Sequence, residues 1–131
     1  MAAPLSSASA GPAYTCPDKI QLPAGAPAGQ DLAANWMLIV SSGPVRLSGV
    51  SVFDGPPQEG AALKPGSVAQ SGATITWKFS GTFAQGKWLA CDYGGGVARA
   101  VMRAPDDSTF CVAHMERRTG PSSFKARFEC S

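Results

Sequence analysis

The feature that most constrains this chain is a two-residue alternation of apolar and polar side chains, interrupted by segments rich in glycine, proline and aspartate. From residue 87 to residue 130 four alternating segments follow one another, separated by the turn sequences GGG, APDDS and RTGPS. Over the whole chain the alternation predicts strands at residues 14–22, 35–41, 45–53, 73–80, 87–93, 97–103, 109–117 and 123–130. Only residues 29–37 could form a short helical turn. The sequence therefore predicts an all-β fold, an antiparallel sandwich or a partly closed barrel.

The last four predicted strands can be placed in register as one meander. Leu89, Cys91 and Tyr93 share a face, and a two-residue turn at Gly94 and Gly95 requires a positive φ at both glycines. The register keeps apolar side chains on a single face. Its facing pairs are Tyr93 with Gly96, Cys91 with Ala98, Leu89 with Ala100, Met102 with Cys111, Ala98 with Met115, Cys111 with Cys130 and Met115 with Ala126. The sequence thus predicts a C-terminal four-strand meander.

Three successive glycines could also indicate a phosphate-binding loop. A loop of the Walker type requires Lys followed by Ser or Thr after its glycines. Here Val97, Ala98 and Arg99 follow, and they continue as a strand rather than as a helix. We therefore interpret the glycines as a turn between two strands.

Four cysteines, Cys16, Cys91, Cys111 and Cys130, restrict the fold further. No two of them have the C-x-x-C spacing of a zinc site, and the single histidine, His114, does not complete a mixed site. Two disulfides and an oxidising compartment are therefore predicted, and in a bacterium that compartment is the periplasm.

The meander register selects one of the three possible disulfide pairings. It places Cys91 and Cys111 two strands apart and four residues out of level, roughly 16 Å, which exceeds the ~7 Å limit between the Cα atoms of a disulfide. It places Cys111 and Cys130 directly opposite each other on neighbouring strands. The predicted bonds are Cys111–Cys130 and Cys16–Cys91, and the second would join the first strand to strand 87–93.

A length of 131 residues predicts one domain. Residues 1–13 are small and polar without periodicity, so we expect a disordered lead followed by a single β domain at residues 14–131. The lead lacks the basic start and apolar stretch of a signal peptide, and no apolar run reaches the ~18 residues of a membrane span. We expect an exported protein without its signal peptide. A net charge of +2 is too small for a general nucleic-acid binder.

Candidate catalytic residues are few. His114 lies within a strand pattern, so we interpret it as a surface or half-buried strand residue rather than a base. Ser51 lacks the second glycine of a nucleophile elbow, and bonded cysteines would leave no thiol nucleophile. The sequence predicts that the protein is not an enzyme and uses no cofactor or metal.

The main candidate for binding a protein partner is the face of the meander opposite the cysteines. The register places Arg99, His114 and Arg127 in one row, with Trp88 in the next row and Arg103 in the one after it. Aromatic side chains combined with arginine are typical of binding hot spots. Two alternatives stay open: a solvated face on which arginine stems lie over aromatic rings, or a second core face covered by the N-terminal strands.

The loop at residues 53–59, FDGPPQE, is a second candidate, with Asp54 and Glu59 as contacts. Its prolines stiffen the backbone, which lowers the entropy lost on binding. The alternative is a structural corner that anchors Phe53 in the core. Two tryptophans are expected to fill the core, Trp36 and Trp77.

Several segments resemble a family of small exported proteobacterial proteins with four cysteines. The shared residues are Cys16-Pro17, Ile20, Trp36, Leu47-Ser48-Gly49-Val50, Phe53-Asp54-Gly55-Pro56-Pro57, Leu63-Lys64-Pro65, Trp77-Lys78-Phe79, Trp88-Leu89-Ala90-Cys91-Asp92-Tyr93, Cys111 and Cys130. The resemblance covers residues 14–131. It implies a periplasmic location, and some members resemble immunity proteins that neutralise peptidoglycan-targeting effectors of type VI secretion.

The resemblance implies that this chain binds and inhibits a protein partner, such as a cell-wall-targeting effector, but it identifies no binding residues. The alternative class of function is a glycan- or envelope-binding module that uses Trp88 as a sugar platform. An enzyme ranks third.

Overall fold

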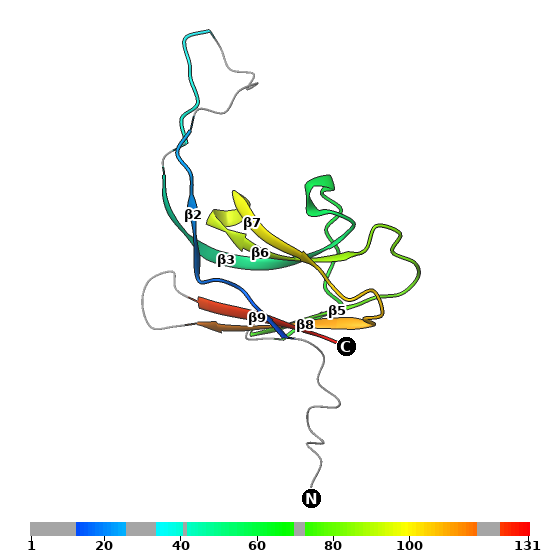
Figure 1. Cartoon of the computed structure of the whole chain (residues 1–131). Coiled ribbons are helices and arrows are strands. Elements are labelled where there is room, and N and C mark those ends of the chain that lie inside the picture. Colours follow the sequence, from blue (N-terminus) through cyan, green and yellow to red (C-terminus); the bar gives the residue numbers. More distant parts are fainter. Residues whose placement is uncertain (1–12, 26–33, 41, 70–72, 118–123) are drawn as a thin grey trace, which may run out of the picture.

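The computed structural model describes residues 13–25, 34–40, 42–69, 73–117 and 124–131, and these form antiparallel strands joined by turns (Figure 1). The strands are β1 (Ala13–Thr15), β2 (Lys19–Leu22), β3 (Gly43–Asp54), β4 (Ser67–Val68), β5 (Thr74–Lys78), β6 (Lys87–Tyr93), β7 (Ala98–Arg103), β8 (Phe110–Arg117) and β9 (Phe124–Cys130). The 3-10 turns of the described residues are η2 (Pro57–Glu59) and η3 (Gly94–Gly96). Ala13, expected to belong to the disordered lead, begins β1, and residues 1–12 lie outside the described residues.

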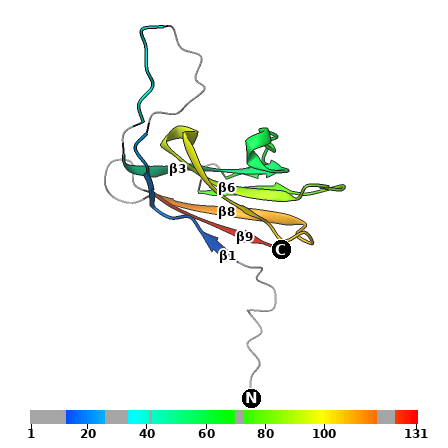
Figure 2. The ribbon, with the colours of Figure 1, turned by 45° about the horizontal axis from the view of Figure 1, so that its top comes forward.

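The strands form two sheets that pack face to face. Sheet 1 has the order β1-β9-β8-β5-β4, and sheet 2 has the order β2-β3-β6-β7. Figure 2 shows the strands β3 and β6 as one layer above β8, β9 and β1. This arrangement confirms the predicted all-β antiparallel sandwich.

The predicted four-strand meander is wrong, because β7 and β8 belong to different sheets. The chain leaves sheet 2 just after β7, where the Ala104 N–H donates to the Lys87 carbonyl (2.7 Å). The buried Lys87 ammonium then donates to the carbonyl oxygens of Asp106 (3.1 Å) and Ser108. These bonds fix the turn that leads the chain into sheet 1, where the Phe110 N–H donates to the Ser131 carbonyl (3.1 Å).

Two of the three predicted hairpins are present. In β8–β9, Cys111 lies opposite Cys130 and Met115 lies opposite Ala126, as predicted. In β6–β7 the register differs by two residues, with Tyr93 opposite Ala98, because the loop holds four residues instead of two. An even shift leaves every side chain on its predicted face, because side chains alternate with a period of two.

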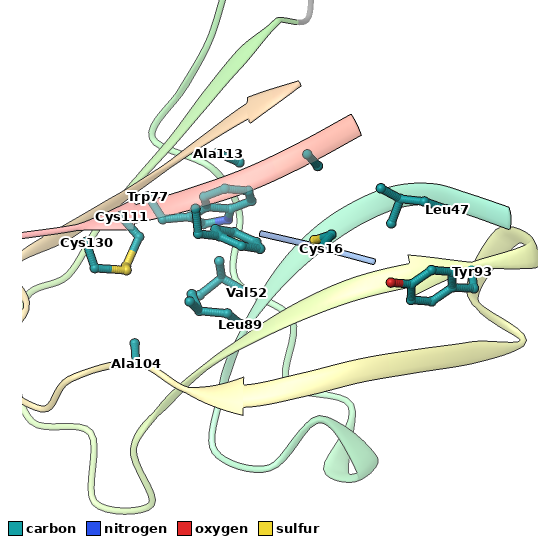
Figure 3. Packing of buried hydrophobic residues seen from close by; sticks show 12 residues of the cluster. Cys16, Leu47, Val52, Trp77, Leu89, Tyr93, Ala104, Cys111, Ala113 and Cys130 are labelled. Carbon is teal, nitrogen blue, oxygen red and sulfur yellow. A yellow bond between two sulfur atoms is a disulfide. The ribbon is translucent and has the colours of Figure 1, made fainter. Parts of the chain in front are cut away.

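The core lies between the two sheets (Figure 3). Its buried residues are Cys16, Leu47, Val52, Trp77, Leu89, Tyr93, Ala104, Cys111, Ala113, Ala126, Phe128 and Cys130. The ring centroids of Trp77 and Phe128 are 6.1 Å apart, and the Tyr93 hydroxyl donates to the Pro17 carbonyl (2.7 Å). Burial, and secondarily the charge of Asp18, raise the pKa of Tyr93 above its usual value. Trp77 thus fills the core as predicted.

Both predicted disulfides are present. Cys16 follows β1 in sheet 1 and is bonded to Cys91 on β6, with a Cα–Cα distance of 5.8 Å. Cys111 and Cys130 are bonded across β8 and β9 within sheet 1, with a Cα–Cα distance of 4.1 Å. The first disulfide therefore joins the two layers covalently, whereas the second lies within one layer.

The glycine-rich segment is a turn, as predicted, with φ of 60° at Gly94 and 72° at Gly95. The Gly95 N–H donates to the Ser48 hydroxyl (2.9 Å), and that hydroxyl donates to the Asp92 carbonyl (3.1 Å). The turn is thus tied to β3 and β6 by hydrogen bonds. Its glycines serve the backbone geometry of the β6–β7 connection.

We expect Gly94→Ala to destabilise the fold more than Gly95→Ala. Both changes place a side chain at positive φ, at a cost of about 1 kcal/mol. A Cβ at Gly94 would also lie 2.7 Å from Val45 Cγ1, whereas a Cβ at Gly95 would meet nothing within 4 Å. Overpacking adds about 1–2 kcal/mol. Urea unfolding of the two variants measures the difference, and equal losses would show that the contact with Val45 has no energetic effect.

Candidate partner-binding surfaces

The predicted binding residues lie on two opposite outer faces of the sandwich. Trp88, Arg99 and Arg103 lie on the outer face of sheet 2, because their neighbours along each strand face the core. His114 and Arg127 face each other on the outer face of sheet 1. The predicted row of Arg99, His114 and Arg127 is therefore wrong, for the same reason that the meander is wrong: β7 does not pair with β8.

The two arginines predicted to bind a partner from sheet 2 are each paired with a carboxylate. Arg99 Nε lies 2.8 Å from Asp92 Oδ1, and the Arg99 guanidinium lies 5.3 Å from the ring centroid of Phe53. Arg103 Nε lies 3.0 Å from Asp106 Oδ1. The charge of each arginine is therefore partly neutralised within the protein, which weakens its attraction for an acidic partner.

The same holds for the outer face of sheet 1. Arg127 forms an ion pair with Glu129, and His114 Nε2 lies 3.9 Å from Glu129 Oε2. This face is thus of mixed charge and only partly exposed, and the N-terminal strands do not cover it as a second core.

The loop at residues 53–59 forms a structural corner. The Gly55 N–H donates to the Gly86 carbonyl (2.8 Å), and the Asp54 N–H donates to the Ala61 carbonyl (3.0 Å). Phe53 is buried, but it lies opposite Trp88 on the outer side of sheet 2 and not in the core between the sheets. Asp54 and Glu59 remain exposed on the rim of this corner.

Residues 36–39 form an exposed apolar strip, which was not predicted from the sequence. The exposed fractions are 75% for Trp36, 78% for Met37, 40% for Leu38 and 65% for Ile39. Residues 36–39 are not part of a strand. The next residue, Val40, forms an isolated β-bridge with Gly25. The predicted strand at residues 35–41 and the predicted core position of Trp36 are therefore wrong.

An apolar hollow opens between the two sheets at one side of the sandwich. It lies between the edge strands β1 and β7 and is lined by Tyr14, Thr15, Pro17, Leu89, Cys91, Ala100, Val101, Met102 and Phe128. Val101 and Met102 are partly exposed at its mouth. The hollow is small and has few polar groups. It could therefore accommodate an apolar side chain, but its lining provides no catalytic group.

The candidate catalytic residues have structural partners. The Ser51 hydroxyl donates to Asp92, the carboxylate that also pairs with Arg99, while His114 contacts Glu129. Within the described ranges no group of three or more His, Cys, Asp or Glu side chains could hold a metal ion. In the same ranges no helix is long and apolar enough to cross a membrane.

Comparison with known proteins identifies the family of this sandwich. The family model for the type VI secretion system Tli immunity protein matches residues 42–131, more than two thirds of the chain. The chain belongs to this family. No curated protein and no solved structure matches it.

The family match covers β3 to β9, that is, all of sheet 2 except β2 and all of sheet 1 except β1. The apolar strip at residues 36–39 lies just outside the matched range. The described residues of this family member thus comprise a matched scaffold and an unmatched N-terminal part that carries the most exposed run of apolar side chains.

Proposed function

We propose that this chain is a periplasmic immunity protein that binds a type VI effector and blocks its activity. The family match over residues 42–131 carries this proposal. Two disulfides support an oxidising compartment, because such bonds form and persist outside the cytoplasm. Binding without catalysis is also in keeping with the partnered His114 and Ser51.

The resemblance seen in the sequence extends the proposal to an effector that attacks peptidoglycan. The alternative of a glycan-binding module gains no support, because Trp88 is half-buried and its indole N–H donates to the Gln85 carbonyl (2.9 Å). A sugar platform requires an open ring face with free polar groups beside it.

Five of the seven predicted contact residues remain candidates for a single interface. Trp88, Arg99 and Arg103 lie on the outer face of sheet 2, while Asp54 at the end of β3 and Glu59 in η2 lie at the rim of the corner beside it. His114 and Arg127 lie on the opposite face of the sandwich. A partner that contacts both sets would have to wrap around the edge of the molecule.

The test is neutralisation of a type VI effector from the bacterium that encodes this chain. Cells that export the effector to the periplasm are expected to survive when this chain is exported with it, and to die when it is retained in the cytoplasm. Purified chain and effector are expected to form a complex in calorimetry. If the chain neither rescues the cells nor binds the effector, the immunity function is refuted. Rescue from an effector that leaves peptidoglycan intact would refute only the proposed target.

A further inference from the structure

We propose that the apolar strip at residues 36–39 inserts into an apolar cleft of the effector and provides the main recognition contact. This inference rests on the proposed function. The strip is the only run of four successive large apolar side chains that the described residues expose; elsewhere on the described surface such side chains are exposed one or two at a time. Patches of this kind mark sites of protein interaction.

The strip projects from the sandwich on a supported base. β2 and β3 pair from Lys19 opposite Arg46 to Leu22 opposite Gly43. Beyond this pair, Gly25 and Val40 exchange two backbone hydrogen bonds, of 2.9 and 2.7 Å. The base next to the strip is therefore held in place before binding, which reduces the conformational entropy lost in the complex.

The shape of this region requires a concave partner. The segment at residues 34–40, drawn in cyan, points away from both sheets in Figures 1 and 2. A projecting apolar element loses most of its contact with water when it enters a cleft, and large aromatic side chains in such positions are typical hot spots. Trp36 is the expected anchor because it offers the largest ring.

The charge distribution favours a protein cleft over a lipid surface. Between Ile20 and Val45 the sequence contains a single charged residue, Asp31. Segments that bind anionic membranes combine apolar residues with lysine or arginine. This region contains no lysine and no arginine. Association through the strip should therefore depend on apolar burial and respond weakly to salt.

The position of the strip relative to the family match points to the effector as the occupant. The matched scaffold begins at residue 42, so the strip lies outside the part of the chain that the family model matches. An immunity protein must favour its own effector over other effectors, and such specificity is a difference between affinities. An element outside the shared scaffold can supply this difference without altering the core.

The experiment compares three purified proteins for binding to the same effector as in the neutralisation test. They are the unaltered chain, the double variant Trp36→Ser/Ile39→Ser and the control variant Val68→Ser, whose side chain is 56% exposed on β4. We expect the double variant to bind at least about 30-fold more weakly and to lose neutralisation, as for a hot spot. We expect the control to be unchanged, and the melting temperature to be the same for all three.

A second measurement separates the strip from the charged face of sheet 2. The loss in the double variant is expected to appear in the dissociation rate and to be similar at low and high salt.

Several results would overturn the inference. If the unaltered chain binds the effector and the double variant binds equally well, the strip is not the contact and the immunity function stands. If the strip instead drives self-association in sedimentation, or binding to phosphatidylglycerol vesicles, while effector binding survives its loss, its occupant is a second copy or a lipid surface. If the unaltered chain does not bind the effector, the proposed function fails together with the inference.

Discussion

A variant with serine at both Cys16 and Cys91 is expected to be about 4 kcal/mol less stable than the unaltered protein. The bond closes a loop with a sequence separation of 75 residues, and in the chain-entropy model the stabilisation grows with loop length. Replacing both residues avoids a free buried thiol. Chemical unfolding of the oxidised proteins measures the difference, and the melting temperature is expected to fall by roughly 10–20 °C.

The matched control is the double serine variant at Cys111 and Cys130. That loop has a sequence separation of 19 residues, so the expected loss is smaller, about 3 kcal/mol. If loss of the Cys111–Cys130 bond costs more stability than loss of the Cys16–Cys91 bond, chain entropy is not the main source of stabilisation by these bonds. The same result would show that joining the two layers through Cys16–Cys91 contributes little to the free energy of unfolding.

Trp77→Ala is expected to destabilise the protein by about 3–5 kcal/mol, because it removes a large buried ring from the centre of the core. The side chain is 3% exposed, packs against Phe128 and donates its indole N–H to the Leu63 carbonyl (3.2 Å). Trp77→Phe keeps an aromatic ring and is expected to lose less, about 1–2 kcal/mol. Equilibrium unfolding in urea measures both.

The control for this prediction is the exposed tryptophan. Trp36→Ala is expected to change the free energy of unfolding by less than about 0.5 kcal/mol, because Trp36 is 75% exposed. A large loss of stability in this variant would contradict the exposed position of the strip, and with it the inference that the strip is available to a partner.

From the alternation of side chains, we could predict which face of a strand is buried more reliably than which strands pair with each other. Leu89, Cys91 and Tyr93 share a face as expected, and β8 and β9 pair in the predicted register. Alternation does not encode which sheet a strand joins, because both sheets of a sandwich have one apolar and one polar face. Where the chain changes sheet after β7, the turn is bonded to Lys87, and the sequence shows this contact only as a lysine at a strand start.

The register of a single hairpin was enough to predict both disulfide bonds. Cys111 opposite Cys130 follows from one correctly predicted hairpin, and the bond of Cys16 to Cys91 then follows by elimination. The wrong meander did not affect this result. It did affect the binding surface, because the row of Arg99, His114 and Arg127 required the pairing of β7 with β8.

The apolar run before residue 41 could not be assigned from the sequence. Trp36–Val40 consists only of large apolar residues, a composition that is typical of a buried strand. Whether such a run is covered depends on elements elsewhere in the chain, and here nothing in the described residues packs over it. Its lack of alternation and of nearby charge sets it apart from the alternating strands of the sandwich, but it does not show whether the run is covered.

The two disulfides also decide what a protease could release from this molecule. One closes a covalent ring from residue 16 to residue 91, and the other closes a ring from residue 111 to residue 130. The projecting segment at residues 34–40 lies within the first ring. A single peptide-bond cleavage there yields two fragments that remain joined through sulfur, so a nicked protein keeps all of its strands until it is reduced.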